Sequence, residues 1–213
     1  MIGVELITKK ELNILFLGAH SDDIEIGCGG TILKIIRNYR VNAVKWIVFS
    51  SNEVRKKEAQ ISAENFLQNV ENKMIEFRSY RDGFLPFSAT EIKNDFEQIK
   101  KSFNPDIIFT HYRQDRHQDH RFLSDLTWNT FRNHLILEYE IPKYDGDFGI
   151  PNFYIPLDED IVNQKNEIIM NSFKSQIKKH WFTEESFNAI LRLRGMESAS
   201  RYSEAFYARK ILF

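Results

Sequence analysis

The feature that most constrains the fold is an alternation of short apolar runs and amphipathic segments over the first two thirds of the chain. The apolar runs lie at residues 14–17, 44–49, 74–77, 106–110 and 135–139, and polar segments bound each of them. Short continuous runs of this kind are typical of strands that are buried on both faces of a parallel sheet. We therefore expect these five segments to be strands.

The segments between these runs have helical spacing. Apolar residues before the fourth run are spaced four, three and four apart, at Ile92, Phe96, Ile99 and Phe103, and fall on one helical face. Ser88, three residues before Glu91, resembles a capping box at the start of that helix. Strand–helix–strand alternation predicts an α/β fold, in which a mostly parallel open sheet carries helices on both sides.

After residue 139 the alternation weakens, and prolines and glycines mark a loop-rich stretch up to residue 151. Beyond it we expect a short strand at 153–155, a helix over roughly 160–178, and a helix at 183–193 that Gly195 ends. We predict a single domain over residues 1–213. Its α/β core would span about residues 1–140, and an extension at about 141–213 would complete the fold.

Composition narrows the classes of partner. The 29 Lys and Arg residues balance 30 Asp and Glu, and a net charge of -1 gives no general reason to expect nucleic acid or an anionic membrane. The single cysteine, Cys28, excludes an intrachain disulfide framework and fits a reducing compartment. The start, MIGVELITKKELN, lacks the apolar core of a signal peptide, and no run approaches the ~20 apolar residues of a membrane span. We predict a cytoplasmic protein.

Two polar clusters follow two of the apolar runs. The first, HSDD at residues 20–23, follows the run at 14–17, and the second, HYRQDRHQDH at residues 111–120, follows the run at 106–110. In an open parallel sheet, ligands bind beyond the carboxyl ends of the strands, where the strand order reverses. With a strand order of 3-2-1-4-5, this crevice lies between the first and fourth strands, so the two clusters would meet there.

The residues of these clusters suit a hydrolytic metal site. His20, Asp23 and His120 would supply two imidazoles and a carboxylate, and a catalytic zinc with three protein ligands keeps a fourth position for water. The pKa of that water falls toward ~7, and the adjacent Asp22 would accept its proton as general base. Zn²⁺ suits such a site, and Fe²⁺, Co²⁺ or Mn²⁺ are alternatives.

The second cluster also offers groups for the leaving side of the reaction. His117 and His120 are three residues apart, so both project from one side if a helix begins near Gln118. His117 would then stabilise the oxyanion and protonate a leaving amine. Either Asp119 or Asp115 would orient an imidazole from behind. The sequence thus predicts amide hydrolysis without a covalent intermediate.

Both clusters carry a family resemblance. Residues 19–30, AHSDDIEIGCGG, resemble the AHPDD…GxGG motif of the PIG-L/LmbE-like N-acetylglucosaminyl deacetylases, and RHQDHR at 116–121 resembles their HPDHR motif. The resemblance implies a Rossmann-like three-layer α/β/α fold, a divalent metal, a small-molecule substrate of the N-acetylated sugar type, and removal of its acetyl group. Homo-oligomers are compatible with it. The implied roles are metal binding for His20, Asp23 and His120, general base for Asp22, and oxyanion support for His117 with Asp119 behind it.

Looser matches extend over most of the chain. RKKEA at 55–59 resembles the family's R-x-x-E-A helix, RDG at 81–83 a turn near the sugar, SQ at 175–176 a late dipeptide, and YSEAF at 202–206 its ending. These matches imply substrate-binding roles for Arg55, Asp82 and Glu204. Ser21 and Gln118 replace two family prolines. Neither is a ligand position, so we expect activity to survive.

Several alternatives stay open on sequence alone. HSDD is common as a polar loop, and residues 117–120 could be a solvated helix start. The glycines at 27, 29 and 30 have GxGG rather than dinucleotide-binding spacing, and the adjacent aspartates would repel a pyrophosphate, so close helix packing is favoured. His111 is either a support for the site or a strand-end residue. Rival functions are deacylation of a non-sugar amide by the same metal core, or a catalytically silent sugar- or metal-binding module.

Overall fold

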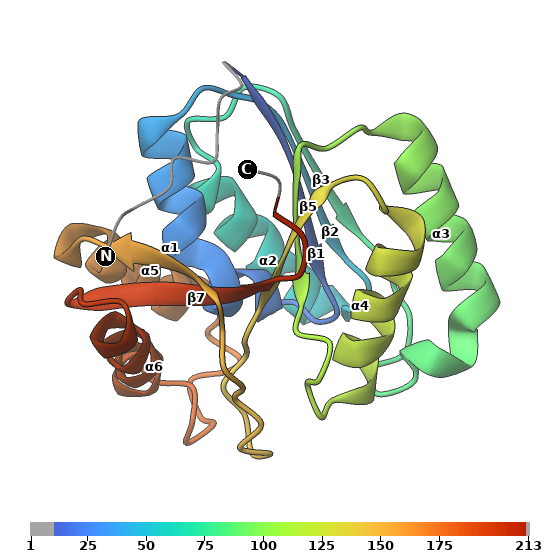
Figure 1. The fold of residues 1–213 in the computed structure, drawn as a ribbon. Helices are drawn as coiled ribbons and strands as arrows, with labels where there is room; N and C mark the ends of the chain where they lie inside the picture. The colour runs from blue at the N-terminus through green and yellow to red at the C-terminus, as the bar shows by residue number, and fades with distance from the viewer. Residues whose placement is uncertain (1–10, 212–213) are drawn as a thin grey trace.

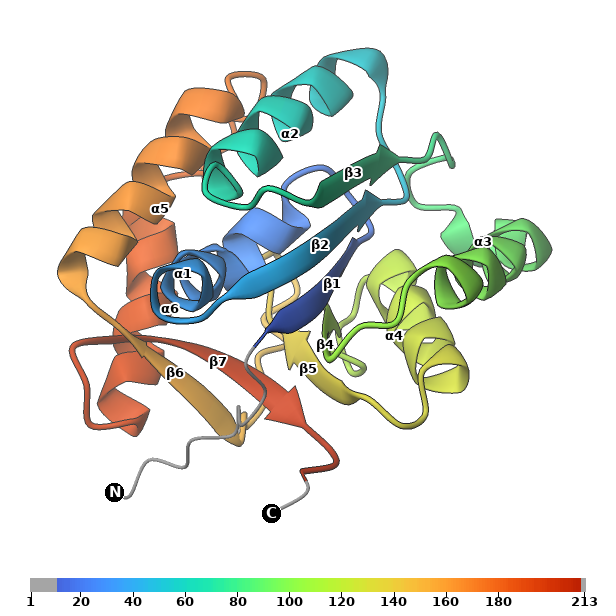
Figure 2. The same ribbon diagram turned by 90° about the horizontal axis from the view of Figure 1, so that it is seen from above.

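The computed structural model describes residues 11–211, in which seven strands form one sheet of order β3-β2-β1-β4-β5-β7-β6 (Figures 1 and 2). The first five strands are parallel, and β7 runs antiparallel to both β5 and β6. The parallel part has the 3-2-1-4-5 order that the convergence of the two clusters requires. The strands are β1 (Leu12–Gly18), β2 (Val41–Val48), β3 (Lys73–Phe77), β4 (Ile107–His111), β5 (Leu135–Tyr139), β6 (Phe153–Leu157) and β7 (Tyr202–Ala208).

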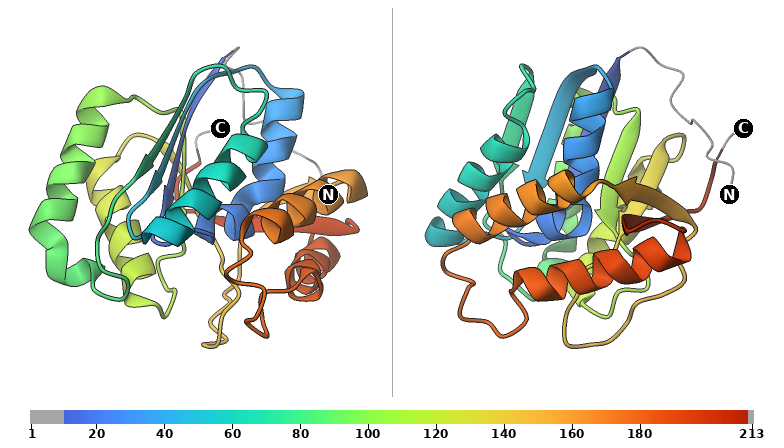
Figure 3. Two further views of the ribbon diagram at one scale, coloured as in Figure 1. Left: turned by 180° about the vertical axis from the view of Figure 1, so that it is seen from behind. Right: turned by 90° about the vertical axis from the view of Figure 1, so that its left-hand side faces the viewer.

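Helices cover both faces of this sheet, which confirms the three-layer α/β/α architecture (Figure 2). On one side α5 packs against α1 and α2, and α6 packs against β7 (Figure 3). On the other side lie α3 and α4, and a short 3-10 helix, η1 (Leu85–Ser88), connects β3 to α3 and packs against α4. The helices are α1 (Asp23–Asn38), α2 (Glu53–Phe66), α3 (Ala89–Ser102), α4 (Gln118–Thr130), α5 (Glu159–Ser172) and α6 (Glu184–Glu197).

The continuous apolar runs are explained by burial on both faces. In β1, Ile14 and Phe16 belong to the core beneath α1 and α2, whereas Leu15 and Leu17 belong to the core beneath α3 and α4. Successive strand residues point to opposite faces, so both sets must be apolar when both faces are covered. Each of the five predicted strands is confirmed, with ends displaced by a few residues at most.

The glycine-rich segment of α1 permits close contact between the helix and the sheet. A Cβ at Gly27 would lie 2.3 Å from the Tyr139 ring on β5, and one at Gly30 would lie 2.4 Å from Leu157 on β6. The helix is also kinked at Cys28, where φ is -145° and ψ is 17°. The packing interpretation of these glycines is therefore confirmed.

Two predictions for the helix ends were wrong, and one expected helix is shorter than predicted. Gly195 does not end α6, which continues to Glu197; glycine is needed there because a Cβ would lie 2.5 Å from the carbonyl oxygen of Arg201. Ser88 makes no side-chain cap bond to α3, because the 3-10 turn η1 leads directly into that helix. The helix expected over 160–178 is α5, which ends at Ser172.

The extension at 141–213 supplies β6, α5, α6 and β7, and its two strands join the edge of the same sheet. The expected strand at 153–155 is the core of β6, whereas β7 was not foreseen. No helix between residues 11 and 211 is long and apolar enough to cross a membrane. Most of the amino-terminal segment in which a signal peptide was not expected, residues 1–10, lies outside the described residues.

Candidate active site and metal centre

The two polar clusters meet at the carboxyl edge of the sheet. Strands β1 and β4 are adjacent and parallel, with Phe16 paired to Phe109, so the loops that leave them start side by side. The rings of His20 and His120, a hundred residues apart in the chain, have their centroids 5.2 Å apart. Helix α4 begins at Gln118, as expected, which places His120 in its first turn.

Three donor atoms of the predicted ligand set form a compact triangle. His20 Nδ1 lies 3.3 Å from Asp23 Oδ2 and 3.2 Å from His120 Nε2, and the remaining pair, His120 Nε2 and Asp23 Oδ2, is 3.5 Å apart. Donors at about 2.0–2.1 Å from a tetrahedral zinc stand roughly 3.3–3.4 Å from one another. The donor chemistry and spacing of these residues therefore fit one divalent metal ion.

Each of the two histidines has a carboxylate on its outer nitrogen. His120 Nδ1 lies 2.9 Å from Asp115 Oδ2, and His20 Nε2 lies 3.3 Å from Asp119 Oδ2 and 3.1 Å from Asp82 Oδ1. Burial lowers the pKa of His20, but these carboxylates and Asp23 outweigh it and hold the pKa well above its usual value. Carboxylates in this position fix the orientation of a metal-binding imidazole and raise its basicity.

The side chain of Asp119 contacts a different imidazole from the one that its motif implied. Its buried carboxylate accepts hydrogen bonds from the backbone N–H groups of Gly83 (2.8 Å) and Leu85 (3.1 Å), and faces His20 rather than His117. Asp119 thereby connects the turn after β3 to the donor triangle. Gln118 joins the same turn from its side-chain amide, which lies 2.9 Å from the carbonyl oxygen of Gly83.

His117 is the N-cap residue of α4, and this fixes its tautomer. Its Nδ1 accepts a hydrogen bond from the backbone N–H of Asp119 at 3.2 Å, so the ring proton of a neutral His117 is on Nε2. Burial, with His120 and His20 nearby, lowers the pKa of His117. The ring stands edge-on to His20, with a centroid distance of 4.8 Å. His117 is thus a neutral N–H donor beside the triangle.

Asp22 is buried next to the triangle and paired with Arg55. Its Oδ1 lies 2.7 Å from Nη2 of Arg55, whose side chain is 18% exposed. Burial raises the pKa of Asp22, and Arg55 opposes that rise. Arg55 therefore does not lie on the open surface of α2.

One turn further along this helix, Glu58 accepts hydrogen bonds from the backbone N–H (2.7 Å) and hydroxyl (2.6 Å) of Ser175. These bonds attach the α5–α6 loop to α2.

His111 is part of the site, which sequence reasoning left undecided. Its ring stacks on His120 with a centroid distance of 3.9 Å, and its Nε2 lies 3.2 Å from Asp23 Oδ2. Asp23, His111 and His120 could thus form an alternative donor set. However, His111 Nε2 also accepts the backbone N–H of Ala19 at 2.9 Å, so its lone pair is already engaged. This favours His20 as the third donor.

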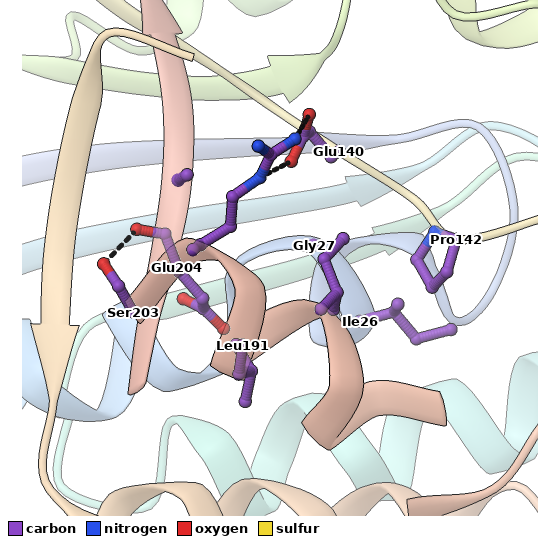
Figure 4. A pocket seen from close by; sticks show the side chains of 10 residues that line it. Ile26, Gly27, Glu140, Pro142, Leu191, Ser203 and Glu204 are labelled. Carbon is purple, nitrogen blue, oxygen red and sulfur yellow. Dashed lines mark hydrogen bonds and ion pairs between the residues drawn. The ribbon is translucent and has the colours of Figure 1, made fainter. Parts of the chain in front are cut away.

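Glu204 lies in a different part of the molecule, in a pocket between α1, α6 and β7 (Figure 4). It is 3% exposed, and it accepts hydrogen bonds from the backbone of Gly30 (2.9 Å) and Thr31 (2.6 Å) and from Nζ of Lys165 (2.7 Å). It caps the second part of the kinked helix α1. These contacts explain Glu204 structurally, in place of the substrate contact that the resemblance implied.

The family model described as PIG-L, GlcNAc-PI de-N-acetylase, matches residues 15–131, which is more than half of the chain. The matched region runs from β1 through α4 and so includes both polar clusters.

Several solved structures share the fold. An N,N'-diacetylchitobiose deacetylase from Pyrococcus horikoshii superposes with a TM-score of 0.71 at 23% identity, covering 92% of this chain and 83% of that one. A zinc-inhibited form of a teicoplanin deacetylase gives 0.70 at 12% identity, with 92% and 97% covered. A 4-carboxy-2-hydroxymuconate hydratase from Pseudomonas putida gives 0.70 at 14%, with 95% and 98% covered. At these identities the likeness concerns the fold, which hosts more than one reaction.

Proposed function

The chain belongs to the PIG-L family, and we propose that it is a metal-dependent N-deacetylase, which removes the acetyl group from an N-acetylated amino sugar or sugar conjugate. The products are acetate and a free amine. The observation that carries the proposal is the donor triangle of His20, Asp23 and His120, with Asp22 and His117 beside it. A module that only binds metal or sugar needs neither of the last two residues.

His20, Asp23 and His120 would hold the metal, with Zn²⁺ as the proposed ion. Such an ion would supply Lewis acidity and lower the pKa of water. Asp22 accepts the proton of the attacking water, and burial supports this role because it raises the pKa of Asp22. Arg55 holds that carboxylate in place at 2.7 Å.

His117 donates a hydrogen bond from Nε2–H to the oxyanion that develops on the acetyl carbonyl. Its tautomer, fixed by the bond from the Asp119 N–H, supports this role. The same neutral state disfavours the second role considered from sequence, protonation of the amine. When the C–N bond breaks, the proton held by Asp22 is the one available to the leaving nitrogen, so one carboxyl acts first as base and then as acid.

The rim of the site supports a ring-shaped substrate. The turn that Asp119 anchors continues into Phe84 and Phe87, whose side chains are 39% and 82% exposed. The guanidinium carbon of Arg81 lies 3.6 Å from the centroid of the Phe84 ring. Aromatic side chains fixed beside a catalytic centre provide apolar faces on which a sugar ring can pack. Asp82, with its carboxylate exposed at the same turn, is the proposed polar contact.

The test is acetate release by the zinc-loaded protein from N-acetylglucosamine, N,N'-diacetylchitobiose and a non-sugar acetamide. We expect release from at least one sugar. Asp22→Asn should bind zinc normally and lose about 10²- to 10⁴-fold in kcat, the typical contribution of a general base. Release from the acetamide alone would replace the sugar substrate, and sugar binding without acetate release would indicate a silent module. Unchanged turnover of Asp22→Asn would remove Asp22 as the base.

A further inference from the structure

One lysine in the loop between β5 and β6 contacts a residue of the candidate metal site. Lys143 places its Nζ 2.9 Å from Asp115 Oδ2 and 2.7 Å from Asp147, and its side chain is 12% exposed. We propose that Lys143 is a positioning residue of the metal site, which acts through Asp115 on the imidazole of His120. The inference rests on the proposed function, because that function makes His120 a metal ligand.

The carboxylate of Asp115 is the link in this chain of contacts. It is buried, and its Oδ2 lies 2.9 Å from both His120 Nδ1 and Lys143 Nζ. Its Oδ1 accepts a hydrogen bond of 2.7 Å from the backbone N–H of His117. One carboxylate thus orients the ring of His120 and the backbone that precedes α4. A displacement of Asp115 would disturb a proposed ligand and the proposed oxyanion donor together.

Lys143 also holds together two groups of like charge. Asp115 and Asp147 each have an oxygen within 2.9 Å of the same ammonium, and Asp147 further accepts the backbone N–H of Arg116 at 2.6 Å. Without the cation, these two partly or fully buried carboxylates would repel each other at short range. Asp115 would then lose its fixed direction toward His120. The position of Lys143 is explained by this need to neutralise the pair.

The first measurement is the zinc dissociation constant of Lys143→Met, by competition with a chromophoric chelator. We expect zinc to bind about 10- to 100-fold more weakly, the usual cost of disturbing the outer partner of a metal ligand. Lys143→Arg, which keeps the cation, should recover most of the affinity. Lys143→Met with Asp147→Asn should recover part of it, because one of the two repelling charges is gone. The absorption bands of the cobalt(II)-loaded proteins should shift in the same order.

Lys45→Met is the matched control, since Lys45 is also a largely buried lysine, 8% exposed, paired with Glu76 at 2.8 Å. It should lower the melting temperature and leave the zinc affinity unchanged. Equal zinc affinity and an unshifted cobalt spectrum in Lys143→Met would overturn the inference and reduce Lys143 to a structural ion pair. Wild-type protein that binds zinc but releases no acetate would overturn the proposed function alone. Wild-type protein that binds no zinc would overturn both.

Discussion

Asp119 and Glu204 are buried carboxylates with almost the same hydrogen bonds, yet they serve different regions of the molecule. Each accepts two backbone N–H groups, from the turn after β3 for Asp119 and from α1 for Glu204. The third partner distinguishes them. It is the outer nitrogen of His20 for Asp119, and the ammonium of Lys165 for Glu204. The same local chemistry therefore supports a metal centre in one region and a kinked helix in the other.

This difference shows what a motif residue can and cannot reveal. Asp119 and Glu204 both lie in segments that resemble family motifs, and both were predicted to act on the substrate or beside it. The distinction depends on what lies behind each carboxylate: His20 turns its other nitrogen to the donor triangle, whereas Lys165 bonds the carbonyl oxygen of Ile26 at 2.7 Å inside the core. A role at the site requires a partner that itself faces the site.

Replacement of the structural carboxylate should give the largest effect on stability. Glu204→Gln removes the charge opposite Lys165, and breaking one partner of a buried ion pair typically costs about 3–5 kcal/mol. We expect that loss in the free energy of unfolding, measured with denaturant, while the zinc affinity of the folded fraction stays unchanged. Weaker zinc binding by folded Glu204→Gln would break the comparison, because it would connect Glu204 to the metal centre.

Replacement of the carboxylate behind His20 should reverse this pattern. Asp119→Asn keeps acceptor capacity for one backbone N–H but weakens the hold on the outer nitrogen of His20. We expect zinc affinity to fall about 10- to 100-fold, equivalent to roughly 1.4–2.7 kcal/mol, with a smaller loss of unfolding free energy than in Glu204→Gln. The measurement is chelator competition alongside denaturant unfolding. Normal zinc affinity with a large stability loss would assign both carboxylates to structure.

The sequence predicted those parts of the fold in which burial produces a recognisable local pattern of apolar residues. Strands covered on both faces are mostly apolar, so the run at 135–139 is visible as β5 although it includes the buried Glu138. Strand β7 is equally buried but reads YSEAFYA, and its Ser203 and Glu204 look like surface residues until their partners are known. The buried polar contacts that stabilise this strand come from segments distant in sequence, which no local pattern reports.

The candidate site divides in the same way. The meeting of His20, Asp23 and His120 could be predicted because they belong to two clusters that follow strands β1 and β4, and the strand order brings these clusters together. His111 joins the site because its ring stacks on that of His120. Lys143 joins it because the loop between β5 and β6 brings its ammonium to Asp115. Neither contact has a trace in the sequence pattern. The carboxylate of Asp119 accepts a hydrogen bond from η1, whereas the backbone N–H of Asp119 donates one to the side chain of His117. The spacing of residues in the sequence cannot show that these two groups have different partners.

Glu25 provides a third buried carboxyl that sharpens the comparison, because no cation pairs with it in residues 11–211. It is fully buried in the first turn of α1, and neither of its carboxylate oxygens has a hydrogen-bond partner among the described residues. Burial raises its pKa well above the usual value. A carboxyl whose folded pKa is raised contributes stability below its unfolded pKa. That stability is lost as the pH rises toward the folded value.

Glu25→Gln removes this titration, so its advantage over the wild type should grow with pH. We expect similar unfolding free energies near pH 4.5 and a variant that is more stable than the wild type at pH 8, with a difference that grows by at most about 1.4 kcal/mol per pH unit. Denaturant unfolding of chelator-treated protein at several pH values measures this. Exposed Glu64→Gln is the control and should leave the pH dependence unchanged. A Glu25→Gln variant that is less stable at every pH would mean that the Glu25 carboxylate is satisfied in the fold, as those of Asp119 and Glu204 are.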